Sequence, residues 1–218
     1  DCSPGKSVLI LVPYRQREQH LAGSAEATCT RFWQRQQHLL QQHCGWESST
    51  ATPRSKGQTD ECGILESVRQ LRRFDCVVFH DVDLLPTNPF VPYNCPAYPR
   101  HISVSIDKFG YSLPYKQLVG GVLAMPVRHF LKVNGYSNLF WGWGGEDDDM
   151  EARPNPRLAR YRMIRHQARK EFLNERYRLD GLNSLSYSLV ASESRPLYTH
   201  FLIDLGQPPR SSSFLLID

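Results

Sequence analysis

The sequence lacks a long apolar run, a paired-cysteine motif and a strong excess of either charge. Its longest apolar stretches are residues 8–12, 76–79 and 214–217, far short of the ~20 residues that a membrane-spanning helix needs. No two of its six cysteines stand in a CxxC spacing, which argues against a zinc knuckle. The net charge of +4, from 26 basic and 22 acidic side chains, is too weak and too evenly mixed to indicate nucleic-acid binding.

The chain contains enough apolar surface to form a folded domain. Its 218 residues are 40% hydrophobic and 11% aromatic, which excludes intrinsic disorder, and the length predicts one domain or at most two small ones. Nothing near Asp1 resembles a signal peptide. We therefore expect either a piece of a longer protein or targeting information outside this stretch.

Strand-like and helix-like segments alternate along the chain, which predicts an α/β fold. Near-continuous aliphatic runs at residues 7–14 and 74–85 indicate buried strands. We expect further strands at 102–106, 119–125, 161–166, 184–190 and 198–204, and helices at 31–42, 63–73 and 127–133. Residues 48–60 are rich in Ser, Thr, Pro and Gly without periodicity, which predicts a loop or a disordered insert.

The first chemical motif is Asp81-Val82-Asp83, which closes a hydrophobic strand. Ligands bind beyond the carboxyl ends of strands in open α/β sheets. If the strand stays regular, both carboxylates point to the same side and reach one hard cation such as Mg²⁺ or Mn²⁺, shared with substrate phosphates. The alternative is that these acids merely cap the strand.

The second motif is the stretch WGWGGEDDD at residues 141–149. Its glycines permit hinge motion and close approach to a ligand, and its tryptophans offer faces for sugar rings. A carboxylate beside such a platform suits a general base that deprotonates a sugar hydroxyl. The alternative is a solvated charge run that follows a buried aromatic loop.

The third motif is Met163 and His166 in RMIRH, which share one side of a turn at this spacing. Histidine is a common neutral metal ligand and a thioether is a poor but possible one. A lone histidine near a strand is more often structural, so both interpretations stay open.

The fourth motif is PYRQR at residues 13–17, directly after the first strand. Arginines at this position are placed to meet a diphosphate. The alternative is the solvated start of a basic helix.

Together these motifs resemble the β-1,4-galactosyltransferase family of animal Golgi enzymes. The resemblance covers roughly two thirds of the chain, in family order, through DCSPGKSVLILVPYRQR, RFDCVVFHDVDLLP, PRHISVSIDKFGYSLPY, VGGVLAM, NGYSNLFWGWGGEDDDM, RYRMIRH, DGLNSLSYSL and PLYTHFLIDLG. It implies a nucleotide-diphosphosugar transferase (GT-A-like) fold, with a mostly parallel central sheet flanked by helices. A single catalytic domain is then expected over residues 1–218, with 22–62 divergent or loop-like.

The family also implies an inverting transfer of galactose or N-acetylgalactosamine from UDP-Gal or UDP-GalNAc to a terminal GlcNAc, xylose or related sugar, with Mn²⁺. Under this resemblance Asp147 is the general base and Glu146 helps to hold the sugars. The metal ligands are Asp83, Met163 and His166. The donor is expected at Pro13, Tyr14, Arg15, Arg17, Asp81, Val82, Lys108, Leu118 and Trp143, with Trp143 on a loop that closes over it, and the acceptor at Glu146, Asp147, Arg176 and Tyr177.

Leu118 carries information about the donor. Family members that prefer UDP-galactose resemble each other in a tyrosine at this position, and members that transfer N-acetylgalactosamine carry a smaller aliphatic residue. Loss of the phenol ring opens space for an N-acetyl group, so Leu118 favours UDP-GalNAc.

The resemblance further implies a disulfide between Cys76 and Cys95, and a type II anchor upstream of Asp1 that places the domain in the Golgi lumen. It is weakest over residues 22–62, where a family strand and a nucleotide-gripping segment are not visible, and at shortenings after Met150 and His166. An inactive relative that binds UDP-sugar or glycan is therefore the alternative. A metal-dependent phosphatase or nuclease explains neither the tryptophan-glycine loop nor the LPY–VGG stretch.

Overall fold

The computed structural model describes eleven segments of the chain, which are residues 6–14, 46–48, 56–71, 73–88, 90–116, 118–142, 145–147, 150, 178–195, 198–207 and 215–217. In chain order the elements are β1 (Val8–Leu11), β2 (Pro13–Tyr14), β3 (Trp46–Ser48), α2 (Lys56–Gln70), β4 (Cys76–His80), β5 (Arg100–His101), the 3₁₀ helix η2 (Asp107–Phe109), β6 (Val122–Pro126), α3 (Val127–Lys132), β7 (Phe140–Gly142), β8 (Ser188–Ser194), β9 (Thr199–Asp204) and β10 (Leu215–Ile217).

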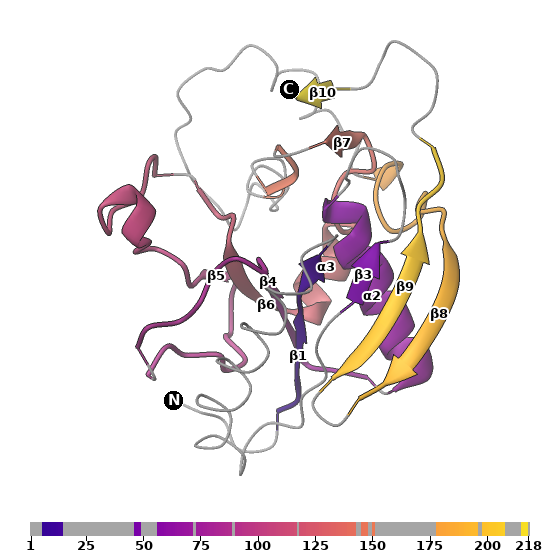
Figure 1. The fold of residues 1–218 in the computed structure, drawn as a ribbon, viewed down its shortest axis with the longest axis horizontal. Coiled ribbons are helices and arrows are strands. Elements are labelled where there is room, and N and C mark those ends of the chain that lie inside the picture. Colours follow the sequence, from indigo (N-terminus) through magenta and orange to yellow (C-terminus); the bar gives the residue numbers. More distant parts are fainter. Residues whose placement is uncertain are drawn as a thin grey trace.

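The central sheet has the strand order β1-β4-β6-β5 (Figure 1). β1 and β4 pair in parallel, from Val8 opposite Cys76 to Leu11 opposite Phe79. β6 runs antiparallel to both β4 and β5. The α/β class is confirmed, but the expected mostly parallel sheet is wrong in this detail. The direction of β6 depends on the path of the long connection after β4, which local sequence does not encode.

A second sheet, with the order β2-β3-β9-β8, continues from the first strand of the chain. β2 pairs in parallel with β3, β3 in parallel with β9, and β9 antiparallel with β8. β3 falls inside the stretch 22–62 that was expected to be loop-like. The expectation also fails from Lys56 onward, where α2 begins.

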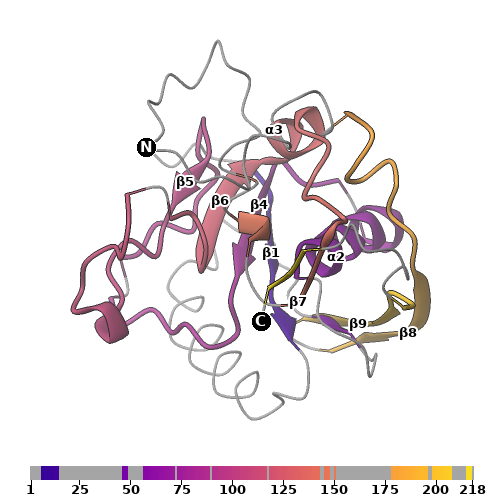
Figure 2. The same cartoon turned by 90° about the horizontal axis from the view of Figure 1, so that it is seen from above.

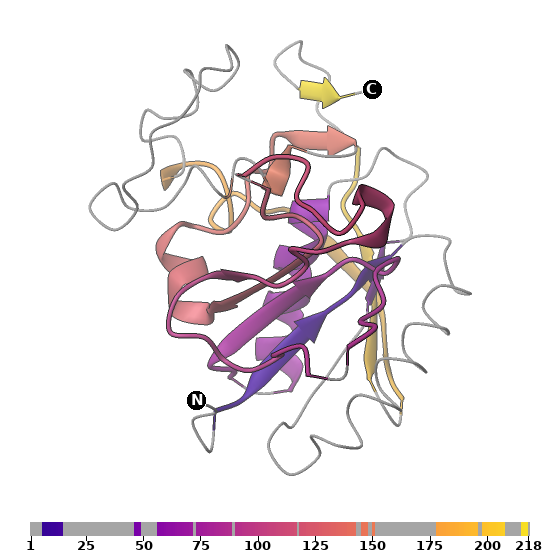
Figure 3. The ribbon, with the colours of Figure 1, turned by 90° about the vertical axis from the view of Figure 1, so that its left-hand side faces the viewer.

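Alternation along the central strands divides the interior into two cores. Leu9, Leu11, Val77 and Phe79 face a cluster that also contains side chains of α2 and α3. Their neighbours in sequence, such as Val8 and Val78, face a second cluster beneath the connection that follows β4. Figure 3 shows this connection crossing one face of the sheet while α2 lies behind the other.

Helix α2 joins the two sheets, and Figure 2 shows it between the central strands and the β8–β9 pair. Cys62 and Ile64 enter the first core. Arg69 lies in the last turn, where a cation interacts favourably with the negative end of the helix dipole. The buried carboxylate of Glu66 accepts hydrogen bonds from Arg69 (2.9 Å), from the Gln70 amide (2.8 Å) and from the hydroxyl of Tyr187 (2.7 Å). No helix within the described ranges is long and apolar enough to cross a membrane.

Several expected elements are shifted in their bounds. The helix at 127–133 and the strand at 198–204 are confirmed as α3 and β9. The stretch 102–106 is not a strand: the ladder with β6 covers Arg100 and His101, and beyond it the N–H of Ile102 still donates to the carbonyl of Val122. The expected strand at 184–190 begins only at Ser188 and runs to Ser194. The elements expected at 31–42 and 161–166 lie outside the described residues.

A disulfide between Cys76 and Cys95 confirms the pairing that the resemblance implied, with 5.3 Å between the two Cα atoms. It ties the first residue of β4 to the connection that crosses the second core. The side chain of Cys76 is fully buried and Cys95 packs against the same cluster. The bond therefore restrains the segment that leads away from Asp81.

Replacement of Cys95 by serine should lower the free energy of unfolding by roughly 2–4 kcal/mol, because the unfolded chain regains the entropy of an open loop. Urea unfolding of the wild type and of Cys95→Ser measures the difference. Reductant should bring the wild type down to the variant's midpoint and leave the variant unchanged. Equal midpoints of the two oxidised proteins would contradict a stabilising role.

Candidate active site

Three segments that were identified as sequence motifs come together at the glycine turn. This turn consists of Gly120 and Gly121 and directly precedes β6. The N–H of Asp81 donates to the carbonyl oxygen of Gly121 over 3.0 Å. A Cβ built on Gly120 would collide with Oδ2 of Asp147, and it would lie 3.6 Å from Cδ1 of Leu118. Glycine at position 120 therefore lets the carboxylate of Asp147 and the side chain of Leu118 approach the backbone that also holds Asp81.

The Asp81–Asp83 motif is a turn rather than the regular end of a strand. β4 ends at His80, and the N–H of Leu84 donates to the carbonyl of Asp81 over 3.2 Å. The strand therefore does not stay regular through the motif, and the condition for both carboxylates to share one strand face is not met. Asp81 pairs instead with Lys56, whose Nζ lies 3.0 Å from Oδ1, while Asp83 is exposed.

The exposed carboxylate of Asp83 suits a hard divalent cation in its chemistry. Met163 and His166, the other expected ligands, lie outside the described residues. Within the described part of the chain, no group of three His, Cys, Asp or Glu side chains is arranged to hold a metal ion. Of the three expected metal ligands, Asp83 is therefore the one that lies within the described residues.

Lys56 is a site residue that no motif marked. It is the first residue of α2, and its side chain is about a quarter exposed. Burial alone would lower the pKa of Lys56, but the negative groups around it, led by Asp81 and Asp60, raise that pKa well above its usual value. The lysine is therefore charged. The start of this helix was not predicted, because the neighbouring sequence is rich in Ser, Thr and Pro and is typical of a loop.

Tyr136 and Glu146 pack against the first turn of α2. A Cβ built on Gly57 would lie 2.7 Å from Cβ of Tyr136 and 3.4 Å from Cβ of Glu146, so a larger residue would push these groups away. Burial raises the pKa of Glu146 and the charge of Asp147 raises it further, while Lys56 opposes both effects. Burial likewise raises the pKa of the Tyr136 phenol, with Asp60 adding to the effect.

Asp60 is completely buried one turn after Lys56, and neither of its carboxylate oxygens has a hydrogen-bond partner among the residues that the structure describes. Burial is the main reason that its pKa lies well above the usual value; Lys56 lowers it, and the charges of Asp81 and Glu146 raise it. An ionised carboxylate without partners is costly in the interior. Asp60 therefore keeps its proton to a higher pH than a free aspartate does.

His80 and Tyr93 form a hydrogen-bonded pair that stabilises the backbone of the Asp81 turn. Nδ1 of His80 donates to the carbonyl of Asp81 over 2.9 Å, and the hydroxyl of Tyr93 donates to Nε2 over 2.8 Å. Burial lowers the pKa of His80, which keeps the ring neutral and lets one nitrogen donate while the other accepts. Tyr93 stands two residues before Cys95, so the disulfide stabilises this support.

The expected donor segment begins at β2. Pro13 is half-buried and Tyr14 is buried, and the hydroxyl of Tyr14 lies 3.2 Å from Nε2 of His200 in β9. The two rings are stacked with centroids 6.0 Å apart. This pair links the end of β2 to β9 within the second sheet. Arg15 and Arg17, which follow directly, lie outside the described residues.

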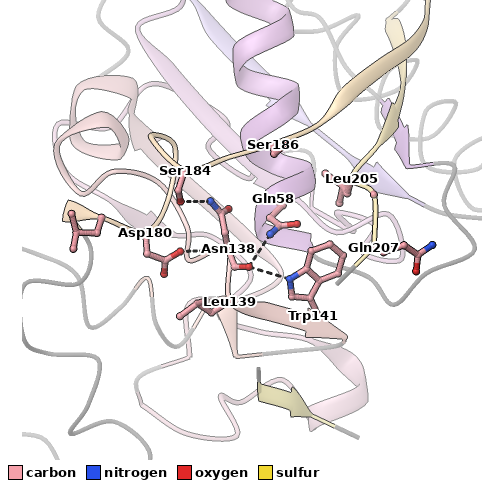
Figure 4. Close-up of a pocket in the computed structure, with 11 residues that line it drawn as sticks. Gln58, Asn138, Leu139, Trp141, Asp180, Ser184, Ser186, Leu205 and Gln207 are labelled. Atoms are coloured by element: carbon pink, nitrogen blue, oxygen red, sulfur yellow. Dashed lines mark hydrogen bonds between the residues drawn. The ribbon is translucent and has the colours of Figure 1, made fainter. Parts of the chain in front are cut away.

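A pocket of about 680 Å³ lies beside Trp141, at the start of the tryptophan-glycine loop (Figure 4). The carbonyl of Asn138 accepts hydrogen bonds from the Gln58 amide (2.8 Å) and from the Trp141 indole (3.1 Å). The side-chain amide of Asn138 donates to the hydroxyl of Ser184, and Asp180 accepts from the Asn138 backbone. These bonds fix the base of the loop to the segment that begins at Asp180.

The remaining expected residues are placed as follows. Val82 is buried, Leu118 is half-buried beside Gly120, and Lys108 is exposed in η2, on the connection that projects from the sheet in Figure 1. The structure therefore brings Leu118, Asp81 and Asp147 together, whereas Lys108 stands with its ammonium over the ring of Phe109 at 5.9 Å. Trp143, Arg176 and Tyr177 lie outside the described residues.

Two family models match consecutive parts of the chain. The N-terminal region of glycosyl transferase group 7 matches residues 1–96, and the N-terminal domain of galactosyltransferase matches residues 100–177. This chain belongs to the β-1,4-galactosyltransferase family.

Individual relatives show the same kinship. The chain is 38% identical to human β-1,4-galactosyltransferase 3 over 96% of its length and 58% of the relative's. It is 36% identical to mouse β-1,4-galactosyltransferase 1, over 95% and 57%, and 32% identical to human β-1,4-galactosyltransferase 2, over 96% and 62%. The chain thus spans about three fifths of the length of these relatives.

The fold matches a solved member of the family. A mutant of Drosophila β-1,4-galactosyltransferase 7, crystallised as a complex with manganese, UDP-Gal and xylobiose, superposes with a TM-score of 0.71 at 24% identity. The match covers 92% of this chain and 94% of that structure. The GT-A-like fold expected from the sequence is therefore confirmed.

Replacement of Asp60 by asparagine should stabilise the protein above about pH 4, the region where a free aspartate ionises. The folded pKa of Asp60 exceeds the unfolded one, so the wild-type residue weakens folding progressively as pH rises from the unfolded to the folded value. We expect a gain of about 1 kcal/mol or more at pH 8, shrinking toward pH 4. Urea unfolding across this range measures it.

The matched control is Asp107→Asn, because Asp107 is exposed in η2. Asp107→Asn should leave the difference in the free energy of unfolding between about pH 4 and about pH 8 the same as in the wild type. A gain for Asp60→Asn that is equal at both pH values would show that Asp60 is ionised in the folded protein.

Proposed function

We propose that this chain is an inverting, Mn²⁺-dependent β-1,4-glycosyltransferase. It moves galactose or N-acetylgalactosamine from a UDP-sugar to a terminal GlcNAc or a related acceptor sugar. The observation that carries the proposal is the meeting of Asp147, Leu118 and the Asp81 turn around Gly120 and Gly121. An acid from the tryptophan-glycine loop thereby stands next to the acidic turn at the end of β4.

In the proposed reaction Asp147 is the general base. Its carboxylate takes the proton from the acceptor's 4-hydroxyl as that oxygen attacks the anomeric carbon, and the bond from this carbon to the UDP oxygen breaks on the opposite face. One base is sufficient, because inversion involves no covalent intermediate with the protein. Burial raises the pKa of Glu146, so its carboxyl is protonated more readily than a free glutamate, and in the proposed reaction it forms a hydrogen bond with a sugar hydroxyl.

The cation would be held by Asp83 with Met163 and His166, and when bound it neutralises the negative charge on the departing UDP. Lys56 holds the carboxylate of Asp81 in an ion pair. Asp81 and Asp83 therefore have different roles in the proposed site. The donor is bound by the segment from Pro13 to Arg17, with Asp81, Val82 and Lys108. Closure of the loop that carries Trp143 excludes water, and Arg176 and Tyr177 contact the acceptor.

The donor sugar is proposed to be UDP-GalNAc in preference to UDP-Gal. Leu118 and the carboxylate of Asp147 both approach Gly120, so the size of residue 118 determines the space beside the reacting centre. Leucine leaves room there for an N-acetyl group that a tyrosine ring would occupy.

We further propose that residues 1–218 form one catalytic domain in the Golgi lumen, carried by a type II membrane parent. The support is the family membership and the Cys76–Cys95 disulfide, a bond that forms in oxidising compartments. No nucleic-acid partner is proposed.

The deciding experiment measures Mn²⁺-dependent sugar transfer from UDP-GalNAc and UDP-Gal to a GlcNAc acceptor. Asp147→Asn should lower kcat by about 10²- to 10⁴-fold, the usual contribution of a general base, and retain UDP binding. Asp83→Ala should lose the Mn²⁺-dependent binding of UDP in calorimetry, and chelation of the metal should do the same to the wild type.

Asp107→Asn is the matched control and should leave both turnover and binding unchanged. UDP binding without transfer by the folded wild type would favour an inactive relative that binds UDP-sugar. Loss of both would show that the donor site is not formed.

Replacement of Leu118 by tyrosine should shift the donor preference toward UDP-Gal. We expect kcat/KM for UDP-GalNAc to fall by about 10-fold or more, because a steric clash of this size disfavours one donor in the transition state. Activity with UDP-Gal should stay the same or rise. Leu131→Tyr, at an exposed leucine in α3, makes the same change away from the site. Unaltered donor ratios in Leu118→Tyr would contradict the assignment.

A further inference from the structure

The carbonyl group of Gly120 is held by two side chains that the reaction scheme does not use. Nε2 of His101 lies 2.8 Å from the Gly120 oxygen, and the hydroxyl of Ser103 donates to the same oxygen over 3.1 Å. His101 is the last residue of β5 and Ser103 lies just beyond it, and Ile102 between them donates its N–H to the carbonyl of Val122 over 2.8 Å. His101 and Ser103 therefore face one side of an extended chain.

The same contacts fix the protonation of the histidine. A carbonyl oxygen only accepts, so the proton of His101 is on Nε2, which also lies 3.0 Å from the Ser103 hydroxyl. Ser103 in turn accepts the N–H of Val122 over 2.8 Å. Burial lowers the pKa of His101, although the Gly120 carbonyl and the charge of Asp147 oppose this shift. The ring is neutral and its donor is committed to Gly120.

The neighbouring peptide is fixed as well. Gly121 has a positive φ of 85°, and a Cβ there would lie 2.5 Å from Oγ of Ser103 and 2.9 Å from Cδ1 of Leu84. Its carbonyl oxygen accepts the N–H of Asp81. The turn is thus restrained by β5 on one side and by the acidic turn on the other, so it cannot rotate without breaking several bonds.

Asp147 lies against this restrained turn. Its Oδ2 occupies the place that a Cβ on Gly120 would take, so any rotation of the Gly120 peptide would displace the carboxylate. We propose that His101 and Ser103 are positioning residues for Asp147, which set the location of the carboxylate by fixing the Gly120 carbonyl. This inference rests on the proposed function, because it concerns the base of that reaction.

The experiment compares two replacements of His101 in the full chain. His101→Phe keeps a planar ring but loses the donor, whereas His101→Gln keeps an N–H close to the place of Nε2. We expect His101→Phe to lower kcat by about 10- to 100-fold, the effect of a misplaced reacting group. The KM for the UDP-sugar and the affinity for Mn²⁺ and UDP should change by less than about twofold, since the donor contacts stay intact.

His101→Gln should restore kcat to within about fivefold of the wild type, which corresponds to about 1 kcal/mol for an imperfect hydrogen bond. Ser103→Ala removes the second donor and should lower kcat by a similar factor, so it tests the proposal even if His101→Phe fails to fold. His129→Phe is the matched control, because His129 lies in α3 and stacks on Tyr98; it should be as active as the wild type.

The outcomes separate the two claims. If the wild type transfers sugar and both His101→Phe and Ser103→Ala retain full kcat, the positioning role is wrong and the proposed function stands. A parallel loss of UDP affinity and melting temperature in these variants, without rescue by glutamine, would also overturn it, since that pattern indicates a purely structural role. If the wild type transfers no sugar, the proposed function fails and the positioning role fails with it.

Discussion

The ion pair between Lys56 and Asp81 is the interaction on which the arrangement of the site depends. Asp60, Glu146 and Asp147 gather around the first turn of α2 and the glycine turn, and like charges this close repel strongly in a partly buried place. One lysine offsets that repulsion, and it also anchors the helix to the end of β4. The remaining excess of acid is relieved by protonation, since burial and neighbouring charge keep Asp60 and Glu146 in their neutral forms more readily.

The fold places this site at the junction of its two sheets. The central sheet supplies the Asp81 turn and the glycine turn, the second sheet supplies Tyr14 and His200, and α2 lies between them. Each contributing segment is short, so its position is set by tertiary bonds. The backbone of Tyr136, for example, donates to the buried carboxylate of Glu61 over 2.8 Å. The position of the segment that leads to Glu146 is therefore set by its bond to α2 and not by its local sequence.

Sequence reasoning located the strands whose aliphatic runs are buried on both faces, such as β1 and β4, because their composition reports burial directly. The motifs around Asp81 and Asp147 were found from their residues and their positions after strands and glycines, whereas the role of each acid and the disulfide were assigned by resemblance. The start of α2 was missed, because its first turn contains Lys56, Gly57 and Asp60, which local propensity assigns to a loop. Contacts of this first turn with Tyr136 and Asp81 stabilise it as a helix. The direction of β6 was missed because pairing is a property of the whole chain.

The outer strands of the second sheet have a consequence for association. Among the described strands, β2 and β8 are the two edges. β2 begins with Pro13, which has no N–H to offer, and β8 carries an irregularity between Leu189 and Ala191 together with Glu193. Proline, bulges and charge at an edge each discourage the addition of a foreign strand. Edges of this kind lower the tendency of two molecules to pair strand to strand through this sheet.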